Sequence, residues 1–166
     1  VSRFDEVYHM AETVYNKWGC VSVLINNAGI TRDNLLIKQT EREWDSVINV
    51  NLKGVFNTIK AFAPLMKEGG HVINISSYSA VKGKEGQAAY SASKSAMLGL
   101  TKSASIELAQ YKIRVNAILP GYMPTKMGLN ARNAINKAKE DSLLNVLSDP
   151  KEVARFILYL VGTENI

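Results

Sequence analysis

The sequence is poor in cysteine and contains no long apolar run. Cys20 is the only cysteine among 166 residues, which excludes an internal disulfide and suits a reducing compartment. No stretch approaches the roughly 20 apolar residues that a membrane-spanning helix needs, and no amino-terminal signal peptide is recognisable. We therefore expect a cytoplasmic protein that does not enter a membrane.

Blocks of like charge are also missing. The net charge is +5 and the pI about 9.3, yet the basic residues are scattered, without a run of five or six. An arm or patch for nucleic acid is therefore not expected; a nucleic-acid-binding α/β domain is the weaker alternative. A phosphate-bearing cofactor or a mildly basic surface explains the charge equally well. No metal site is expected.

Repeats, low-complexity segments and linkers are absent as well, which predicts a single domain over residues 1–166. Instead, helical and strand patterns alternate. Short apolar runs predict strands at 21–26, 71–76 and 113–119. Apolar spacing predicts helices at about 4–19, 40–66, 88–111, 127–147 and 150–161. Thr40 and Glu43 form a predicted capping box at the start of the second helix.

This alternation predicts an α/β fold. Helices between successive strands require parallel crossover connections, and strands that are apolar on both faces suit a sheet with helices on both sides. Three strands are fewer than the five or six of a usual sheet, and their apolar edges would lie uncovered. We therefore expect strand-rich segments before Val1, after Ile166, or both.

Tyrosine and lysine stand four residues apart in three places: Tyr78–Lys82, Tyr90–Lys94 and Tyr122–Lys126. Pro124 disfavours a shared helical face for the last pair, and the first pair is predicted to lie in a loop. Only Tyr90 and Lys94 lie in a long predicted helix, where residues four apart share a face.

The pair of Tyr90 and Lys94 is a candidate acid and base. A free phenol has a pKa near 10, and a neighbouring ammonium lowers this pKa, so that a tyrosine becomes useful for proton transfer near neutral pH. The small residues at 91–93 leave the backbone open to close approach. On spacing alone, an amphipathic helix with a packed tyrosine and a solvated lysine is the better explanation.

Five motifs give this pair its context. They are NNAG at 26–29, NVNLKGVF at 49–56, NISSYSA at 74–80, YSASK at 90–94 and PGYMPT at 120–125. With these motifs, the chain resembles the short-chain dehydrogenase/reductases from Val1 to Ile166. The resemblance implies a Rossmann-type doubly wound parallel sheet. The chain would cover the fourth to sixth strands and their helices, with the N-terminal strands and the last strand missing.

The resemblance also implies a role for each site residue. Tyr90 would transfer a proton to or from the substrate oxygen, and Lys94 would lower the Tyr90 pKa and hydrogen-bond the nicotinamide ribose. Ser77, which lies 13 residues before Tyr90, would polarise the carbonyl. Asn51 would distort its helix and hold a water that links Lys94 to solvent. The implied cofactor-binding residues are Asn27, Gly29, Tyr90, Lys94, Gly121, Met123 and Thr125.

Plainer interpretations exist for single residues of this set. Asn27 is typical of a turn at a strand end, Ser77 of a cap, and Thr125 of a helix N-cap. The family's glycine-rich phosphate loop is absent from the sequence, as is the residue that separates NAD from NADP. The chain is therefore either part of a longer protein or a truncated product without activity.

The resemblance implies carbonyl reduction with NADP or NAD, NADPH being favoured. NNAGITRDNLL at 26–36 is most similar to members that reduce 3-oxoacyl thioesters of acyl carrier protein in fatty acid synthesis. Those members usually carry arginines where this chain has Glu68 and Tyr111; the neighbouring Lys67 and Lys112 are less suited to a planar contact. A coenzyme A thioester, a sugar or a small ketone stays open, as does an inactive scaffold subunit.

A homodimer or homotetramer is expected as well. The predicted helices at 40–67 and 88–111 carry more apolar residues than one sheet face covers, and family members pair these helices across a two-fold axis. The residues concerned are Val55, Phe56, Ile59, Phe62, Met97, Leu98, Leu100 and Ile106.

Overall fold

The structure of the protein is a computed structural model, which describes residues 1–125, 134–140, 142 and 145–162. The chain divides into two compact units, Val1–Ile118 and Leu119–Ile166. The first unit contains a sheet and most of the helices. The second contains α6 (Ala134–Glu140) and α7 (Pro150–Gly162). The expectation of a single domain over 1–166 stays a prediction.

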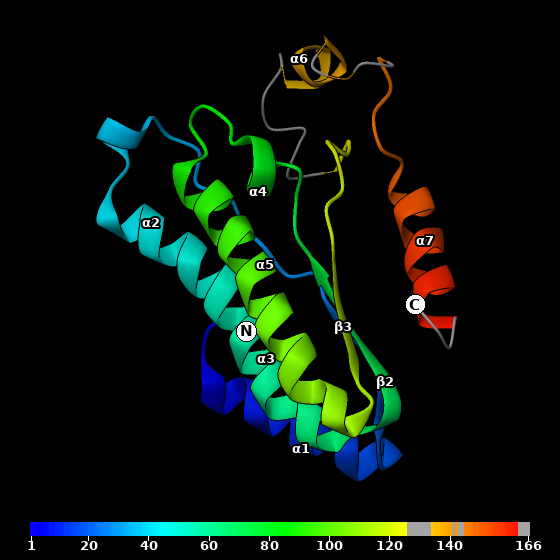
Figure 1. Ribbon diagram of the computed structural model, residues 1–166. Helices are drawn as coiled ribbons and strands as arrows, with labels where there is room; N and C mark the ends of the chain where they lie inside the picture. Colours follow the sequence, from blue (N-terminus) through cyan, green and yellow to red (C-terminus); the bar gives the residue numbers. More distant parts are fainter. Residues whose placement is uncertain (126–133, 141, 143–144, 163–166) are drawn as a thin grey trace. The chain divides into compact units, whose positions relative to one another are not determined.

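The sheet of the first unit consists of parallel strands in the order β1–β2–β3 (Figure 1). They are β1 (Val21–Asn26), β2 (Met66–Ile75) and β3 (Arg114–Ile118). Leu24 pairs with Val72, and Ile73 pairs with Asn116. The predicted α/β class and the parallel arrangement of the three strands are therefore confirmed.

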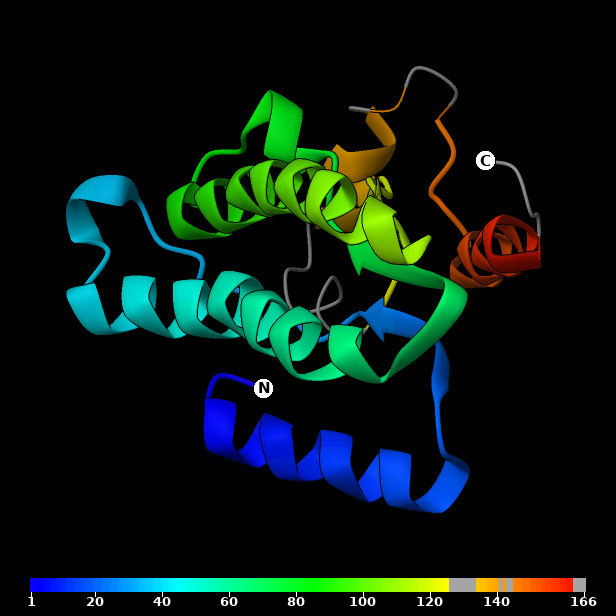
Figure 2. The same ribbon diagram turned by 60° about the horizontal axis from the view of Figure 1, so that its bottom comes forward.

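The α-helices of the first unit lie against the sheet or against one another. They are α1 (Phe4–Trp18), α2 (Glu41–Ile48), α3 (Gly54–Phe62), α4 (Ser79–Lys82) and α5 (Ala88–Leu108). Figures 1 and 2 show α3 between α1 and α5. One apolar cluster joins α3 and α5 to β2 and β3, and a second joins α1 to α3. Leu24 packs against both clusters, so β1 faces this helical layer with that side chain.

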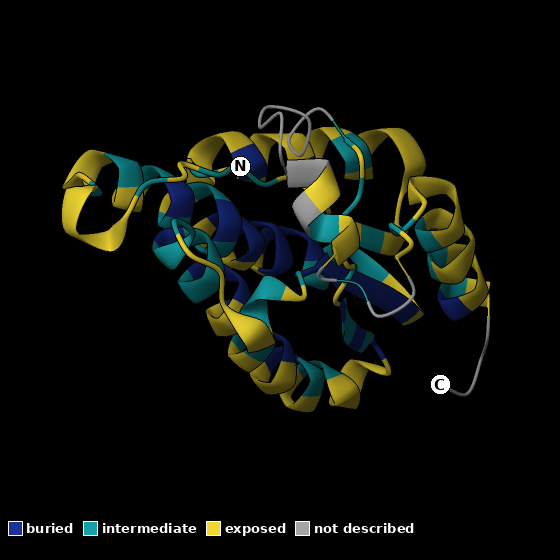
Figure 3. Ribbon diagram, turned by 90° about the horizontal axis from the view of Figure 1, so that it is seen from above, coloured by how far each residue is buried: buried dark blue, intermediate teal, exposed yellow. Residues whose placement is uncertain are grey.

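Neighbouring side chains of a strand point to opposite faces, and burial in β1 alternates in this way from Val23 to Asn26. Val23 and Ile25 are 37% and 46% exposed, whereas Asn26 is buried. In contrast, β2 is buried from Gly70 to its end at Ile75. Buried residues accordingly gather where the helices meet the sheet (Figure 3).

The helix predicted over 40–66 is present as a helical stretch from Glu41 to Leu65, which is distorted at Asn49–Lys53. The capping box is present: the Thr40 hydroxyl accepts from the Glu43 amide at 3.2 Å, and the Glu43 carboxylate accepts from the Thr40 amide at 2.9 Å. A π-helical turn at Asn49–Lys53 then separates α2 from α3, and a 3₁₀ turn at Ala63–Leu65 ends the helical stretch. Pro64 in that turn has no amide for an α-helical hydrogen bond, and β2 begins directly afterwards.

Two further predictions need correction. Tyr78 and Lys82 do not lie in a loop, because α4 places them one turn apart, with the Lys82 amide 3.2 Å from the Tyr78 carbonyl. The helix predicted at 88–111 ends at Leu108, and a 3₁₀ turn follows at Ala109–Tyr111. Of the helix predicted at 127–147, residues 127–133, 141 and 143–144 lie outside the described residues, and α6 falls within the rest.

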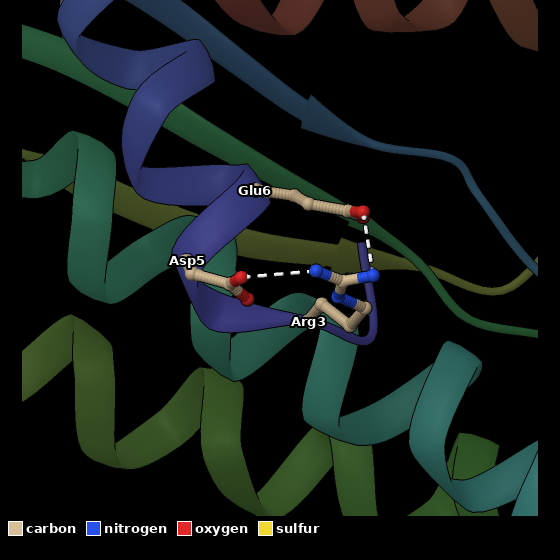
Figure 4. A network of polar contacts seen from close by, with 3 residues as sticks. All are labelled: Arg3, Asp5 and Glu6. Carbon is tan, nitrogen blue, oxygen red and sulfur yellow. Dashed lines mark hydrogen bonds and ion pairs between the residues drawn. The ribbon is translucent and has the colours of Figure 1, made fainter.

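Exposed charges mark the start of α1. Arg3 contacts the Asp5 carboxylate at 3.1 Å and the Glu6 carboxylate at 3.2 Å, and Figure 4 shows its guanidinium between the two. The hydrogen bond from Arg3 lowers the pKa of Asp5. Acidic groups in a first turn also complement the helix dipole, but exposed pairs of this kind add little stability.

Most of the apolar residues on which the predicted oligomer rests are internal. Val55, Ile59, Phe62 and Met97 are buried in the first unit, and Leu98 and Leu100 are half-buried. Only Phe56 and Ile106 are exposed, at 46% and 78%. The dimer or tetramer stays a prediction. No helix in the described part of the chain is long and apolar enough to cross a membrane.

The capping box predicts a measurable contribution to stability. Thr40→Ala removes the hydroxyl that accepts from the Glu43 amide, so we expect the free energy of unfolding to fall by about 1 kcal/mol. Urea denaturation measures this change. Thr13→Ala in α1 is the matched control, because the Thr13 hydroxyl only donates to the His9 carbonyl within its own helix. An equal loss in both variants would contradict the capping interpretation.

Candidate active site

The carboxyl ends of the parallel strands bring three predicted site residues to one edge of the sheet. Asn27 directly follows β1, Gly29 lies two residues further, and Ser77 is the second residue after β2. This edge is where open α/β sheets bind ligands. Asn27 is exposed, whereas Gly29 and Ser77 are half-buried.

Asn51 ties the loop after β1 to α5. It is fully buried in the π-helical turn. Its amide oxygen accepts from the Ile30 amide at 2.8 Å, and its amide nitrogen donates to the Ile30 carbonyl at 3.0 Å and to the Ser93 hydroxyl at 3.1 Å. The helix is thus distorted at Asn51, as expected.

Gly29 lies against the same group of residues. A Cβ at this position would stand 3.4 Å from the Asn51 amide oxygen and 3.6 Å from Lys94 Nζ. A side chain would therefore occupy the space beside the ammonium. Its absence leaves room there for a bound molecule, which fits the ribose contact that the sequence predicts for Gly29 and Lys94.

Lys94 is a buried cation. The residue is 4% exposed, and its ammonium donates to the Ile75 carbonyl at the end of β2 at 2.6 Å. The Lys94 carbonyl in turn accepts from the Ser76 hydroxyl at 2.9 Å. Burial disfavours the charged form and lowers the pKa of Lys94 to about 8. The ammonium therefore remains the main form at pH 7.

Tyr90 meets both Ser77 and Lys94. Its hydroxyl is hydrogen-bonded to the Ser77 side chain, and Lys94 Nζ lies 5.7 Å from its ring centroid. Burial raises the pKa of Tyr90, the Ser77 hydrogen bond partly opposes this, and the negative charge of Asp33 raises it further. The predicted lowering of this pKa by Lys94 is therefore not found, since the ammonium is directed to the Ile75 carbonyl.

The Tyr78–Lys82 pair lacks such surroundings. Tyr78 is 54% exposed and Lys82 is exposed as well, so solvent surrounds both groups. Lys126 lies outside the described residues. Tyr90 and Lys94 are thus the pair that the described residues enclose.

The remaining predicted cofactor residues belong to the second unit. The Thr125 amide donates to the Met123 carbonyl at 2.8 Å. A Cβ on Gly121 would lie 3.0 Å from the Ser148 hydroxyl, which leaves little space for a larger residue. Contacts of Gly121, Met123 and Thr125 with a cofactor stay predictions.

Sequence reasoning missed three residues of the site. It treated Ser93 only as a small residue, whereas Ser93 is fully buried and its hydroxyl donates to the Tyr90 carbonyl at 2.7 Å while accepting from Asn51. It also overlooked Asp33 and Gln87, whose side chains are hydrogen-bonded beside α5. For Ser93, the signal was a serine inside a predicted helix, next to a predicted site residue. Nothing in the spacing of the sequence pointed to Asp33 or Gln87.

The buried ammonium predicts a stability that rises with pH. Because the folded pKa of Lys94 is about 8 and the unfolded value about 10.5, the unfolded chain binds more protons between these values. We expect the free energy of unfolding to increase from pH 8 to pH 10.5 by on the order of 3 kcal/mol, relative to Lys94→Met. Denaturation across this range measures it. Lys102→Met, on the exposed side of α5, should retain the rise; a parallel pH dependence in wild type and Lys94→Met would contradict the prediction.

The sequence matches known proteins over nearly its whole length. Residues 1–165 match the family described as Enoyl-(Acyl carrier protein) reductase. The 3-oxoacyl-[acyl-carrier-protein] reductase FabG of Thermotoga maritima is 42% identical over 171 residues, which cover 99% of this chain and 68% of that protein. The protein of that name from Staphylococcus epidermidis is 45% identical over 169 residues, covering 98% and 68%. Nodulation protein G of Azospirillum brasilense is 41% identical over 165 residues, covering 98% and 67%.

These matches agree with the parallel sheet and with the five motifs of the sequence. The chain spans about two thirds of the length of these relatives. It belongs to the short-chain dehydrogenase/reductase family, whose members are NAD(P)-dependent oxidoreductases.

Proposed function

We propose that the protein of which this chain forms part reduces the ketone of a 3-oxoacyl thioester to the 3-hydroxyacyl form, with NADPH as reductant. The observation that carries this proposal is the half-buried Tyr90, which has the buried Lys94 ammonium 5.7 Å from its ring centroid and Ser77 acting to lower its pKa. The names of the relatives from Thermotoga maritima and Staphylococcus epidermidis describe this reaction. The choice of NADPH over NADH rests on the family resemblance alone.

The family description names an enoyl reduction, whereas these relatives are named for a 3-oxoacyl reduction. Ketone reduction creates negative charge on one oxygen, which then takes up a proton. Two hydroxyl groups, those of Ser77 and Tyr90, lie together at the site and suit this requirement. The ketone is therefore the better substrate for this geometry.

The residues present fit a nicotinamide cofactor, which supplies the hydride when bound. Lys94 and Gly29 would hold its ribose, because the glycine leaves open the space beside the ammonium. Asn27 would approach the same ribose, and Gly121, Met123 and Thr125 would contact the nicotinamide end. Asn51 keeps Gly29 and α5 in register through its bonds to Ile30 and Ser93.

Tyr90 then acts as the acid. The pKa of Tyr90 is raised, so its phenol is protonated at neutral pH and would supply the proton that the carbonyl oxygen takes up on reduction. Ser77 donates a hydrogen bond to the same oxygen and disperses its developing charge. A proton from solvent would then restore the phenol of Tyr90.

One observation bears on the thioester. Glu68 and Lys112 form an exposed ion pair, which lowers the pKa of Glu68 through the hydrogen bond from Lys112. Lys112 is thus already engaged with a carboxylate at the positions where arginines would contact an acidic carrier protein. This favours coenzyme A thioesters as a second substrate class beside carrier-bound ones.

The first prediction for this function separates the tyrosines. Tyr90→Phe preserves the packed ring but removes the proton, so kcat for acetoacetyl thioester reduction should fall at least 10²-fold, as is usual for a lost general acid. The loss of NADPH absorbance measures this rate. Tyr78→Phe is the control, because Tyr78 is exposed outside the Ser77–Tyr90 contact. Turnover that survives Tyr90→Phe and disappears in Tyr78→Phe would overturn the assignment.

The second prediction concerns the carrier. Wild type should reduce acetoacetyl-coenzyme A at least as efficiently as acetoacetyl-acyl carrier protein, compared as kcat/KM. Glu68→Arg replaces the carboxylate by a cation and frees Lys112, so it should raise kcat/KM severalfold for the carrier-bound substrate alone, most clearly at low salt. Glu41→Arg, an equal charge change on α2, should not. A strong wild-type preference for the carrier, unchanged in Glu68→Arg, would exclude this role for the ion pair.

A further inference from the structure

The loop after β1 is fastened to the start of α5 by three contacts. Gln87 Nε2 donates to the Asp33 carboxylate at 3.0 Å, the Asn34 amide donates to the Gly86 carbonyl at 2.8 Å, and Asn34 and Gln87 form a short parallel bridge. These contacts join residues more than fifty positions apart in the sequence. They hold the carboxylate of Asp33, an exposed loop residue, in one position.

Gln87, which holds the Asp33 carboxylate, is one helical turn from Tyr90. Gln87 is the N-cap of α5, and its carbonyl already accepts the helical hydrogen bond from the Ser91 amide at 2.8 Å. Tyr90 follows three residues later, so the two side chains lie on one side of the helix. The charge of Asp33 reaches the phenol, because it contributes to the raised pKa of Tyr90.

No ion pair neutralises this carboxylate within the described residues. Gln87 is a neutral donor, and the guanidinium of the adjacent Arg32 donates to the Thr31 carbonyl. Lys94 is buried, with its ammonium directed to the Ile75 carbonyl. A substrate oxygen at the Tyr90 hydroxyl therefore lies in the field of a fixed, exposed negative charge.

We propose that Asp33 is a specificity-determining residue, held in place by Gln87, that disfavours substrates with a negative charge next to the reacting carbonyl. The proposal rests on the proposed carbonyl reduction at Tyr90. It narrows the substrate class to neutral oxo compounds, such as thioesters and esters, and disfavours free 3-oxo acids. In those acids the carboxylate stands two bonds beyond the carbonyl carbon, within the reach of this charge.

Two substrates of nearly equal size test the proposal: acetoacetate, which is an anion, and methyl acetoacetate, which is neutral. The ratio of their kcat/KM values with NADPH is compared in wild type, Asp33→Asn and Asp33→Lys. Asparagine retains an oxygen that accepts from Gln87, so this variant changes the charge and preserves the contact. Each step in the charge of residue 33, from negative to neutral to positive, should raise the ratio of kcat/KM for acetoacetate to kcat/KM for methyl acetoacetate roughly three- to tenfold at low salt.

The controls separate charge from structure. The change in the ratio should shrink as ionic strength rises, because an exposed charge is screened, whereas a loosened loop would not respond in this way. Asp45→Asn, an exposed carboxylate on α2, should leave the ratio unchanged. Gln87→Leu, which frees the Asp33 side chain, should move the ratio in the same direction as Asp33→Asn.

The outcomes are distinct. A wild type that reduces methyl acetoacetate supports carbonyl reduction, whatever the ratio. If it does so and the ratio fails to follow the charge at position 33, the specificity role of Asp33 is wrong. If neither ketone is turned over while cofactor is bound, the proposed function itself fails, and this inference fails with it.

Discussion

The geometry of the site depends on one buried amide. Asn51 is fully enclosed, and its bonds to Ile30 and Ser93 engage both of its polar atoms. Leaving a polar group of this buried amide without a partner would cost about 1–3 kcal/mol of folding free energy. The bonds of Asn51 therefore hold the π-helical turn, the loop after β1 and α5 together. This constraint places Gly29 against Lys94 and therefore defines the space beside the ammonium.

A buried ammonium beside a half-buried phenol opposes charge at both groups. Burial lowers the pKa of Lys94 to about 8 and raises that of Tyr90, so both shifts disfavour the charged forms. The bond from Lys94 to the Ile75 carbonyl compensates part of the burial. This bond also holds the ammonium at the end of β2, beside the space that Gly29 leaves open.

The sequence predicted the parallel sheet because apolar runs mark its strands. The choice of Tyr90 and Lys94 rested on the five motifs rather than on spacing alone, and the roles of the site residues stay predictions. The resemblance also led us to expect a distortion at Asn51, but the bond of Asn51 to Ile30, a contact across the fold, could not be read from the sequence. The direction of the Tyr90 pKa shift was not predicted correctly for a related reason. Spacing shows that an ammonium is near, but burial decides which effect on the pKa dominates. The sequence did not indicate a role for Asp33, because its position is set by a hydrogen bond from the distant Gln87.

The residues proposed to support the reaction are buried, whereas those proposed to select the substrate are exposed. Asn51, Ser93 and Lys94 are fixed by buried hydrogen bonds, so replacing them disturbs packing as well as reaction. Asp33 and the pair of Glu68 and Lys112 are exposed, so solvent and salt screen their charges. Exposed charges contribute little to stability, yet a difference of 1.4 kcal/mol between two substrates is about tenfold in preference. We therefore expect the choice of substrate to depend on such exposed charges, while the buried amide of Asn51 holds the loop after β1 and α5 together.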